Sequence, residues 1–172
     1  TPAAAPNFFI HTSLESWPWR GGALAMHLGR LVSVLAGLVL VVATYGIGRR
    51  LWPDRPDVAL AGAAFVAFMP ESLFIAGSMS NDMLAAMFCG LALWAGLARP
   101  APEHPGAWIW MALAAGACMG LAFISKVSTA ALWPVAAACL LLGAAGPLPA
   151  QPRSAWRRLV GQVRARPWPV LR

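Results

Sequence analysis

From Leu31 to Gly48 the chain carries no charged side chain, and Leu, Val and Ala make up most of this stretch. A helix needs about 20 mostly apolar residues to cross the roughly 30 Å hydrocarbon core of a bilayer. Because lipid cannot satisfy free backbone groups, a spanning segment of this kind must be helical. The stretch therefore predicts a membrane helix, and we expect it to cover residues 23–47.

The composition of the whole chain places it in the same class. Of its 172 residues 59% are hydrophobic and 11% are charged, whereas soluble domains carry about 25% charged residues. The formal net charge of +7 does not indicate nucleic-acid binding, because apolar segments separate the Lys and Arg residues that would have to share one solvated face. Cys89, Cys118 and Cys139 lie in apolar runs without CxxC spacing, so they predict neither a zinc site nor disulfides.

Four further apolar segments follow the first one. They cover residues 58–79, 83–98, 106–125 and 127–145. Pro70 and Glu71 interrupt the first of these, the second is short unless Asn81 and Asp82 cap it, and Lys126 alone separates the last two. The predicted fold class is all-α: a polytopic membrane helix bundle of about five transmembrane helices, part of a larger membrane domain.

The chain divides into three parts on this basis. Residues 1–22 are expected to form an outer-face loop segment, residues 23–146 the five-helix transmembrane region, and residues 147–172 a basic cytoplasmic tail or interfacial helix. The start at Thr1, without Met or a signal-peptide pattern, indicates a fragment of a longer protein. Gly116 and Gly120 form a GxxxG pair, which favours close contact between helices.

The orientation follows from the positive charges. If the first helix runs inward, ten of the 13 Lys and Arg residues fall on one side and three on the other, which makes the first side cytoplasmic. The ten are Arg49, Arg50, Arg55, Arg99, Arg153, Arg157, Arg158, Arg164, Arg166 and Arg172, and the three are Arg20, Arg30 and Lys126.

The remaining polar residues then gather at the outer face. They are His11, Glu15, Arg20, His27, Arg30, Glu71, Asn81, Asp82 and Lys126. An ionisable group in a membrane helix costs about 2.5–3.5 kcal/mol on insertion scales and usually faces a bundle interior or wet cavity. Simpler explanations stay open: Asp82 as a helix cap, Glu71 as a first-turn acid, Lys126 as a snorkelling lysine and Arg30 as a basic anchor.

An acid and several cations at one membrane face suit the transfer of a group from a lipid phosphate. A carboxylate can accept the proton of an incoming hydroxyl or amine. Lys and Arg side chains can stabilise the charge of the leaving phosphate. The spacing of the residues is compatible with this chemistry and does not by itself prove it.

Three segments carry a family resemblance: "NFFIHTSLESWPWRGGALAMHLGRLVSVLAG", "PESLFIAGSMSNDML" and "GLAFISKVSTAALWP". Their order resembles the GT-C glycosyltransferases, in particular the bacterial branch similar to protein O-mannosyltransferases and the lipid A aminoarabinose transferase. The resemblance covers most of residues 7–145. It implies a bacterial inner-membrane enzyme that takes a sugar from a polyprenyl-phosphate carrier and transfers it to a protein, lipid or glycan on the non-cytoplasmic face.

The resemblance also implies roles for individual residues. Asp82 matches the acid of the second outer loop, Lys126 the lysine of a "GLxxxxK" segment, and Arg30 the arginine that opens the second membrane helix. The main catalytic acid of the family lies in a first outer loop upstream of Thr1, so the fragment alone is expected to be inactive. The candidate catalytic residues are Asp82 and Glu15, and the candidate substrate-binding residues are Lys126, Arg30, Asn81, His11 and Glu71. No metal ligand is identified, no cofactor is certain, and a divalent metal is left open.

Two other classes of function compete with this one. An acid and a lysine within a membrane can form a transport relay, although transporter sites lie at the bilayer midplane and these charges gather at one face. A small accessory subunit, complete at 172 residues, would use its polar residues only to contact a partner.

Overall fold

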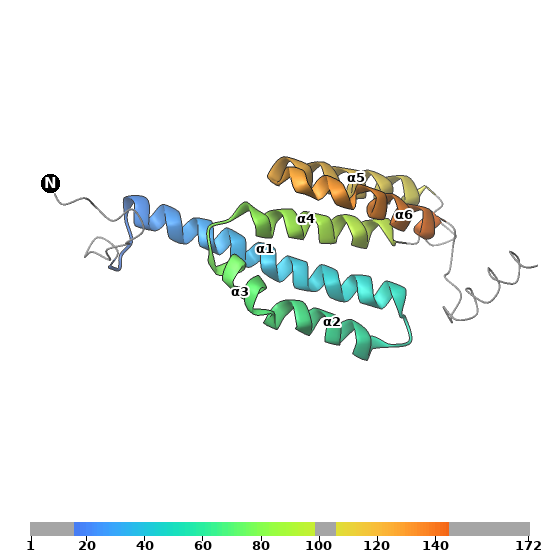
Figure 1. The fold of residues 1–172 in the computed structure, drawn as a ribbon, viewed down its shortest axis with the longest axis horizontal. Coiled ribbons are helices and arrows are strands. Elements are labelled where there is room, and N and C mark those ends of the chain that lie inside the picture. Colours follow the sequence, from blue (N-terminus) through green and yellow to red (C-terminus); the bar gives the residue numbers. More distant parts are fainter. Residues whose placement is uncertain (1–15, 99–105, 145–172) are drawn as a thin grey trace, which may run out of the picture.

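The computed structural model describes residues 16–98 and 106–144, and every regular element in these ranges is helical. Figure 1 shows their arrangement. The elements are α1 (Gly21–Leu51), α2 (Pro56–Phe68), α3 (Pro70–Gly77), α4 (Asn81–Gly96), α5 (Ala107–Ser125), the 3-10 helix η2 (Val127–Leu132) and α6 (Trp133–Ala144). The all-α helix bundle predicted from the sequence is confirmed.

The helices pack around α1 and α4, which lie side by side. In Figure 1, α2 and α3 flank α1 on one side, while α5 and α6 cover α4 on the other. Gly37 of α1 lies against Met83 of α4, and Gly46 lies against Trp94, so the two helices run parallel, in the same direction. The start of α4 therefore lies at the opposite end of the bundle from the end of α1.

By length and composition, α1 and α5 are each long and apolar enough to cross a membrane. The pair α2 and α3 passes the same test together, but it is bent by 55° at its break. The helix α4, with 16 residues, and the apolar stretch Val127–Leu141 are shorter. All five expected segments form helices, and two or three of them are long enough to span by this measure.

The break between α2 and α3 occurs where the sequence predicts an interruption. Met69 is extended, with φ −65° and ψ 123°, and Pro70 opens α3 with Glu71 in its first turn. Proline suits this first position, because its missing N–H would be unpaired there anyway. Beside the bend lies an apolar pocket of about 220 Å³, lined by residues of α1, α2 and α3 and by Met83.

Close helix contacts form at glycines other than the predicted GxxxG pair. A Cβ at Gly46 would overlap the ring of Trp94, and one at Gly48 would come within 2.7 Å of the Cα of Ala59. A Cβ at Gly116 or Gly120 would meet nothing within 4 Å. The prediction that these two glycines mediate close packing is therefore wrong for the described residues, because their face of α5 is turned away from the neighbouring helices.

Candidate functional site

The site begins at the turn that joins α3 to α4. Ser80 is extended, with φ −132° and ψ 143°, and its Oγ accepts a hydrogen bond of 3.1 Å from the backbone N–H of Asp82. This is the usual geometry of a serine N-cap. The sequence left open that Asn81 and Asp82 cap this helix; the structure instead places both in its first turn, with Ser80 as the cap. The Asp82 carboxylate is left for another partner.

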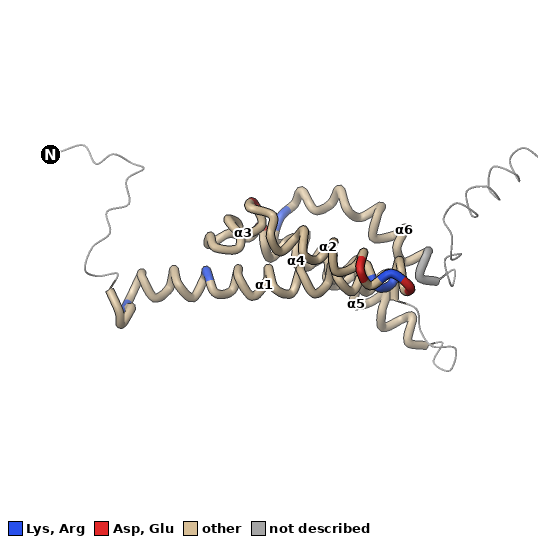
Figure 2. The backbone as a smooth tube through the Cα atoms, turned by 90° about the horizontal axis from the view of Figure 1, so that it is seen from below, with Lys and Arg blue, Asp and Glu red and all other residues tan. Residues whose placement is uncertain are grey.

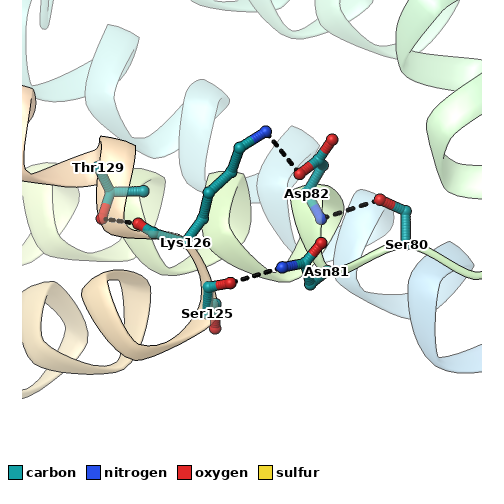
Figure 3. Close-up of polar contacts among 6 residues, drawn as sticks. All are labelled: Ser80, Asn81, Asp82, Ser125, Lys126 and Thr129. Atoms are coloured by element: carbon teal, nitrogen blue, oxygen red, sulfur yellow. Dashed lines mark hydrogen bonds and ion pairs between the residues drawn. The ribbon is translucent and has the colours of Figure 1, made fainter.

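That partner is Lys126, 44 residues further along the chain. Its Nζ donates a hydrogen bond of 2.7 Å to Oδ1 of Asp82, and the two charges form an ion pair (Figure 3). Lys126 lies between α5 and η2 and has an extended backbone, with φ −157° and ψ 116°. The side chains are 47% and 38% exposed for Lys126 and Asp82, so a ligand can reach both groups.

A second contact joins the same two chain segments. Nδ2 of Asn81 donates a hydrogen bond of 2.6 Å to the carbonyl oxygen of Ser125. The last carbonyls of a helix lack intrahelical partners, and Asn81 supplies one for α5. The backbone around Lys126 is held as well, because its N–H donates to the Ala122 carbonyl and its own carbonyl accepts from Oγ1 of Thr129, both at 2.8 Å. Two consecutive residues of α4 thus bind two consecutive residues at the end of α5.

The helix α1 supports this turn from its other side. The hydroxyl of Ser33 is buried and donates to the carbonyl oxygens of Gly29 and Ser80, at 3.3 and 3.5 Å. Sequence reasoning identified neither Ser33 nor Ser80 as part of the site. A usable signal was present for Ser33, because a hydroxyl in an apolar helix needs a hydrogen-bond partner when buried.

The other candidate residues are not joined to the ion pair. Arg30 and Glu71 are exposed, and within the described ranges neither forms an ion pair with Asp82 or Lys126. His11 and Glu15 lie outside the described residues. The ring of His27 contacts that of Trp19, with centroids 3.6 Å apart. No group of three or more His, Cys, Asp or Glu side chains in the described part of the chain could hold a metal ion.

The opposite end of the bundle has a different charge pattern. Figure 2 shows several charged residues of both signs where α1 passes into α2. Arg55 forms a 2.7 Å ion pair with Asp57, and hydrogen bonding to that carboxylate raises the pKa of the Arg55 guanidinium. The guanidinium of Arg50 lies over the Trp94 ring, 5.2 Å from its centroid, within the range of a cation–π interaction.

The site therefore combines an accessible carboxylate, an accessible ammonium group and a rigid backbone at one end of a membrane bundle. The carboxylate can accept a proton from a hydroxyl or amine. The ammonium group can bind an anion such as a phosphate. Both groups are attached to helix ends that hydrogen bonds hold in register.

Comparison with known proteins assigns the chain to a family. No curated protein and no solved structure matches the chain. A family model described as dolichyl-phosphate-mannose-protein mannosyltransferase matches residues 21–154. This match covers most of the chain and all of α1 to α6, and it confirms the resemblance stated from the sequence. The chain therefore belongs to the dolichyl-phosphate-mannose-protein mannosyltransferase family and is a domain of the membrane glycosyltransferase type.

Proposed function

We propose that this chain contributes donor-phosphate and acceptor contacts to a membrane glycosyltransferase. The enzyme transfers a sugar from a polyprenyl-phosphate donor to a protein, lipid or glycan acceptor in a single displacement. The observation that carries the proposal is the 2.7 Å contact between Asp82 and Lys126, in a chain of the mannosyltransferase family. It joins an acid to a cation, the two kinds of group that such a transfer needs.

Lys126 is proposed to bind the phosphate of the donor. As the bond between sugar and phosphate breaks, negative charge accumulates on the phosphate oxygen that leaves. An ammonium group held at a fixed position stabilises this charge most where water is partly excluded. The hydrogen bonds from Asn81 to Ser125 and from Thr129 to Lys126 fix the backbone that carries the ammonium group.

Asp82 is proposed to act on the acceptor. Its carboxylate orients the acceptor hydroxyl or amine and can take up the proton that this group loses as it bonds to the sugar. A divalent metal bound by Asp82 and by groups outside the described residues is compatible with this role. Glu15, the other candidate acid, and His11 are retained as proposals for the same acceptor side.

Arg30 is proposed as a second contact for the phosphate. It lies three residues before Ser33 on α1, so the two share a face of the helix. Ser33 reaches the Ser80 carbonyl, which places this face of α1 beside the start of α4. Glu71, in the first turn of α3, is proposed to line the acceptor side of the same end of the bundle.

The site is proposed to face the non-cytoplasmic side of the bacterial inner membrane. Support comes from the arginines at the opposite end of the bundle, since positive residues favour the cytoplasmic side. The ion pair lies at the ends of α4 and α5, and a transporter site would instead be expected near the middle of the membrane.

The test replaces Asp82 by Asn in the full natural protein and measures sugar transfer from a polyprenyl-phosphate donor. Removal of a general base is expected to lower kcat about 10²- to 10⁴-fold. Asp54→Asn makes the same change of charge at the opposite end of the bundle and should leave transfer unchanged. Full activity of the Asp82→Asn protein would remove Asp82 from the mechanism.

A further inference from the structure

The ion pair of the site leaves little net charge at the position where a phosphate is proposed to bind. Nζ of Lys126 lies 2.7 Å from Oδ1 of Asp82. Within the described ranges no other cation contacts the Asp82 carboxylate. The ammonium group that should attract the donor is thus already neutralised by a carboxylate of the same protein.

A phosphate that approaches Lys126 must contend with this carboxylate. An ammonium group has three donors, so it can contact both anions at once. The two anions would then lie within several ångströms of each other, and a neighbouring like charge disfavours the ionised form of each. One positive charge cannot balance a carboxylate together with a phosphate. The competition favours a geometry in which one of the two anions leaves.

The Asp82 side chain is free to be the one that leaves. It is 38% exposed, and among the described residues the bond from Lys126 is the one hydrogen bond that its carboxylate oxygens make with another side chain. The backbone does not need to move, because the N–H of Asp82 is bound independently by Ser80. Rotation of one side chain is sufficient to release Lys126.

We propose that Asp82 occupies the phosphate position on Lys126 while the site is empty, and that the donor phosphate displaces it. The released carboxylate then faces the acceptor. In this way the acid becomes available only once the donor has bound, which limits its action on acceptors when no sugar is present. This proposal rests on the proposed function, because it takes Lys126 to be the phosphate contact.

The experiment measures binding of undecaprenyl phosphate to the full natural protein in nanodiscs. Undecaprenol, which lacks the phosphate, reports binding of the hydrocarbon chain alone, and inorganic phosphate reports binding of the anion alone. Asp82→Asn removes the competing charge and keeps the side-chain size. We expect it to bind undecaprenyl phosphate about two- to fivefold more tightly, the range that corresponds to a partly exposed ion pair. Undecaprenol binding should stay the same.

Three further variants complete the test. Asp54→Asn should leave the affinity unchanged, which shows that the gain is local. Lys126→Met should weaken phosphate binding. When Asp82→Asn is added to the Lys126→Met protein, it should give no increase in affinity from breaking the ion pair, because that pair is already absent. Unchanged or weaker binding by Asp82→Asn, with weaker binding by Lys126→Met, would overturn the displacement and leave Lys126 as a phosphate contact. Unchanged binding by Lys126→Met would overturn the phosphate contact itself.

Discussion

Asn81 determines the position of Lys126 without touching its side chain. The 2.6 Å hydrogen bond from Nδ2 of Asn81 ends on the Ser125 carbonyl, which belongs to the peptide bond that joins Ser125 to Lys126. If this bond is lost, the end of α5 keeps an unpaired carbonyl and the ammonium group gains freedom. At the scale of the residue, Asn81 therefore acts as a positioning residue whose effect should be visible in both stability and binding.

Asn81→Ala is expected to lower the free energy of unfolding by about 0.5–1.5 kcal/mol, the usual contribution of one hydrogen bond. Asn81→Asp should lower the free energy of unfolding at least as much. An acid is favourable at a helix start, but a carboxylate accepts hydrogen bonds and cannot donate one to the Ser125 carbonyl, which is also an acceptor. Thermal unfolding in detergent and undecaprenyl phosphate binding measure the two effects. Ser128→Ala, which truncates an exposed polar side chain of η2, serves as the control. Wild-type stability and affinity in both Asn81 variants would exclude the positioning role.

The identity of the cap shows what sequence could and could not predict at this scale. The polar run from Ser80 to Asp82 indicated a helix start, and the sidedness argument put Asp82 and Lys126 at one end. Three adjacent polar residues can all serve as caps, and local propensity does not choose among them. The choice depends on Ser125 and Lys126, which bind Asn81 and Asp82 from another helix and leave Ser80 as the cap.

At the scale of the helix, α1 and α2 approach each other closely because Gly48 has no side chain. A Cβ at Gly48 would lie 2.7 Å from the Cα of Ala59 and 2.8 Å from its Cβ. Both are inside van der Waals contact, and one is backbone, which cannot rotate away. The short turn between the helices allows little adjustment, because only residues 52–55 separate the end of α1 from the start of α2.

Gly48→Ala should therefore separate α1 from α2 and lower the free energy of unfolding by about 1–3 kcal/mol, as overpacking typically does. Gly62→Ala is the matched change in α2, where a Cβ would meet nothing within 4 Å. It should be neutral or stabilise by up to about 1 kcal/mol, because alanine is the better helix former. Denaturation in mixed micelles can compare the two. An equal effect at both positions would contradict the close contact.

Helix boundaries were more predictable than helix contacts. The apolar runs and the Pro70 interruption follow from local composition and from the missing N–H of proline, and all of them are found in the structure. The GxxxG pair was misleading because a small residue allows close contact without specifying a partner. Gly46 forms a close helix contact because Trp94 lies opposite it, and such a pairing depends on the register between the helices.

At the scale of the whole molecule, the bundle has two chemically different ends. One end carries Asp82 and Lys126, and the other carries Arg49, Arg50 and Arg55. The positive-inside rule predicts that the second end faces the cytoplasm.

Labelling can test this orientation in cells. With the three native cysteines replaced by alanine, a cysteine at Met79, which is 65% exposed, should react with an impermeant maleimide added outside the inner membrane. A cysteine at Asp54, at the other end, should react only after the membrane is opened. The reverse pattern would contradict the proposed orientation and with it an outward-facing site.

The length of α1 has a consequence for how the proposed substrates would reach the proposed site. Gly21–Val32 precede Ser33, the residue that contacts the α4 start, and at about 1.5 Å per residue they extend roughly 18 Å beyond it. Figure 1 shows this part of α1 projecting past the other helices. Arg30 lies close to the Ser33 end of this segment, and His27 lies about midway along it, where its ring contacts that of Trp19. Under the proposed function, a bulky acceptor is therefore expected to reach the site from the flanks that this projecting segment of α1 leaves clear.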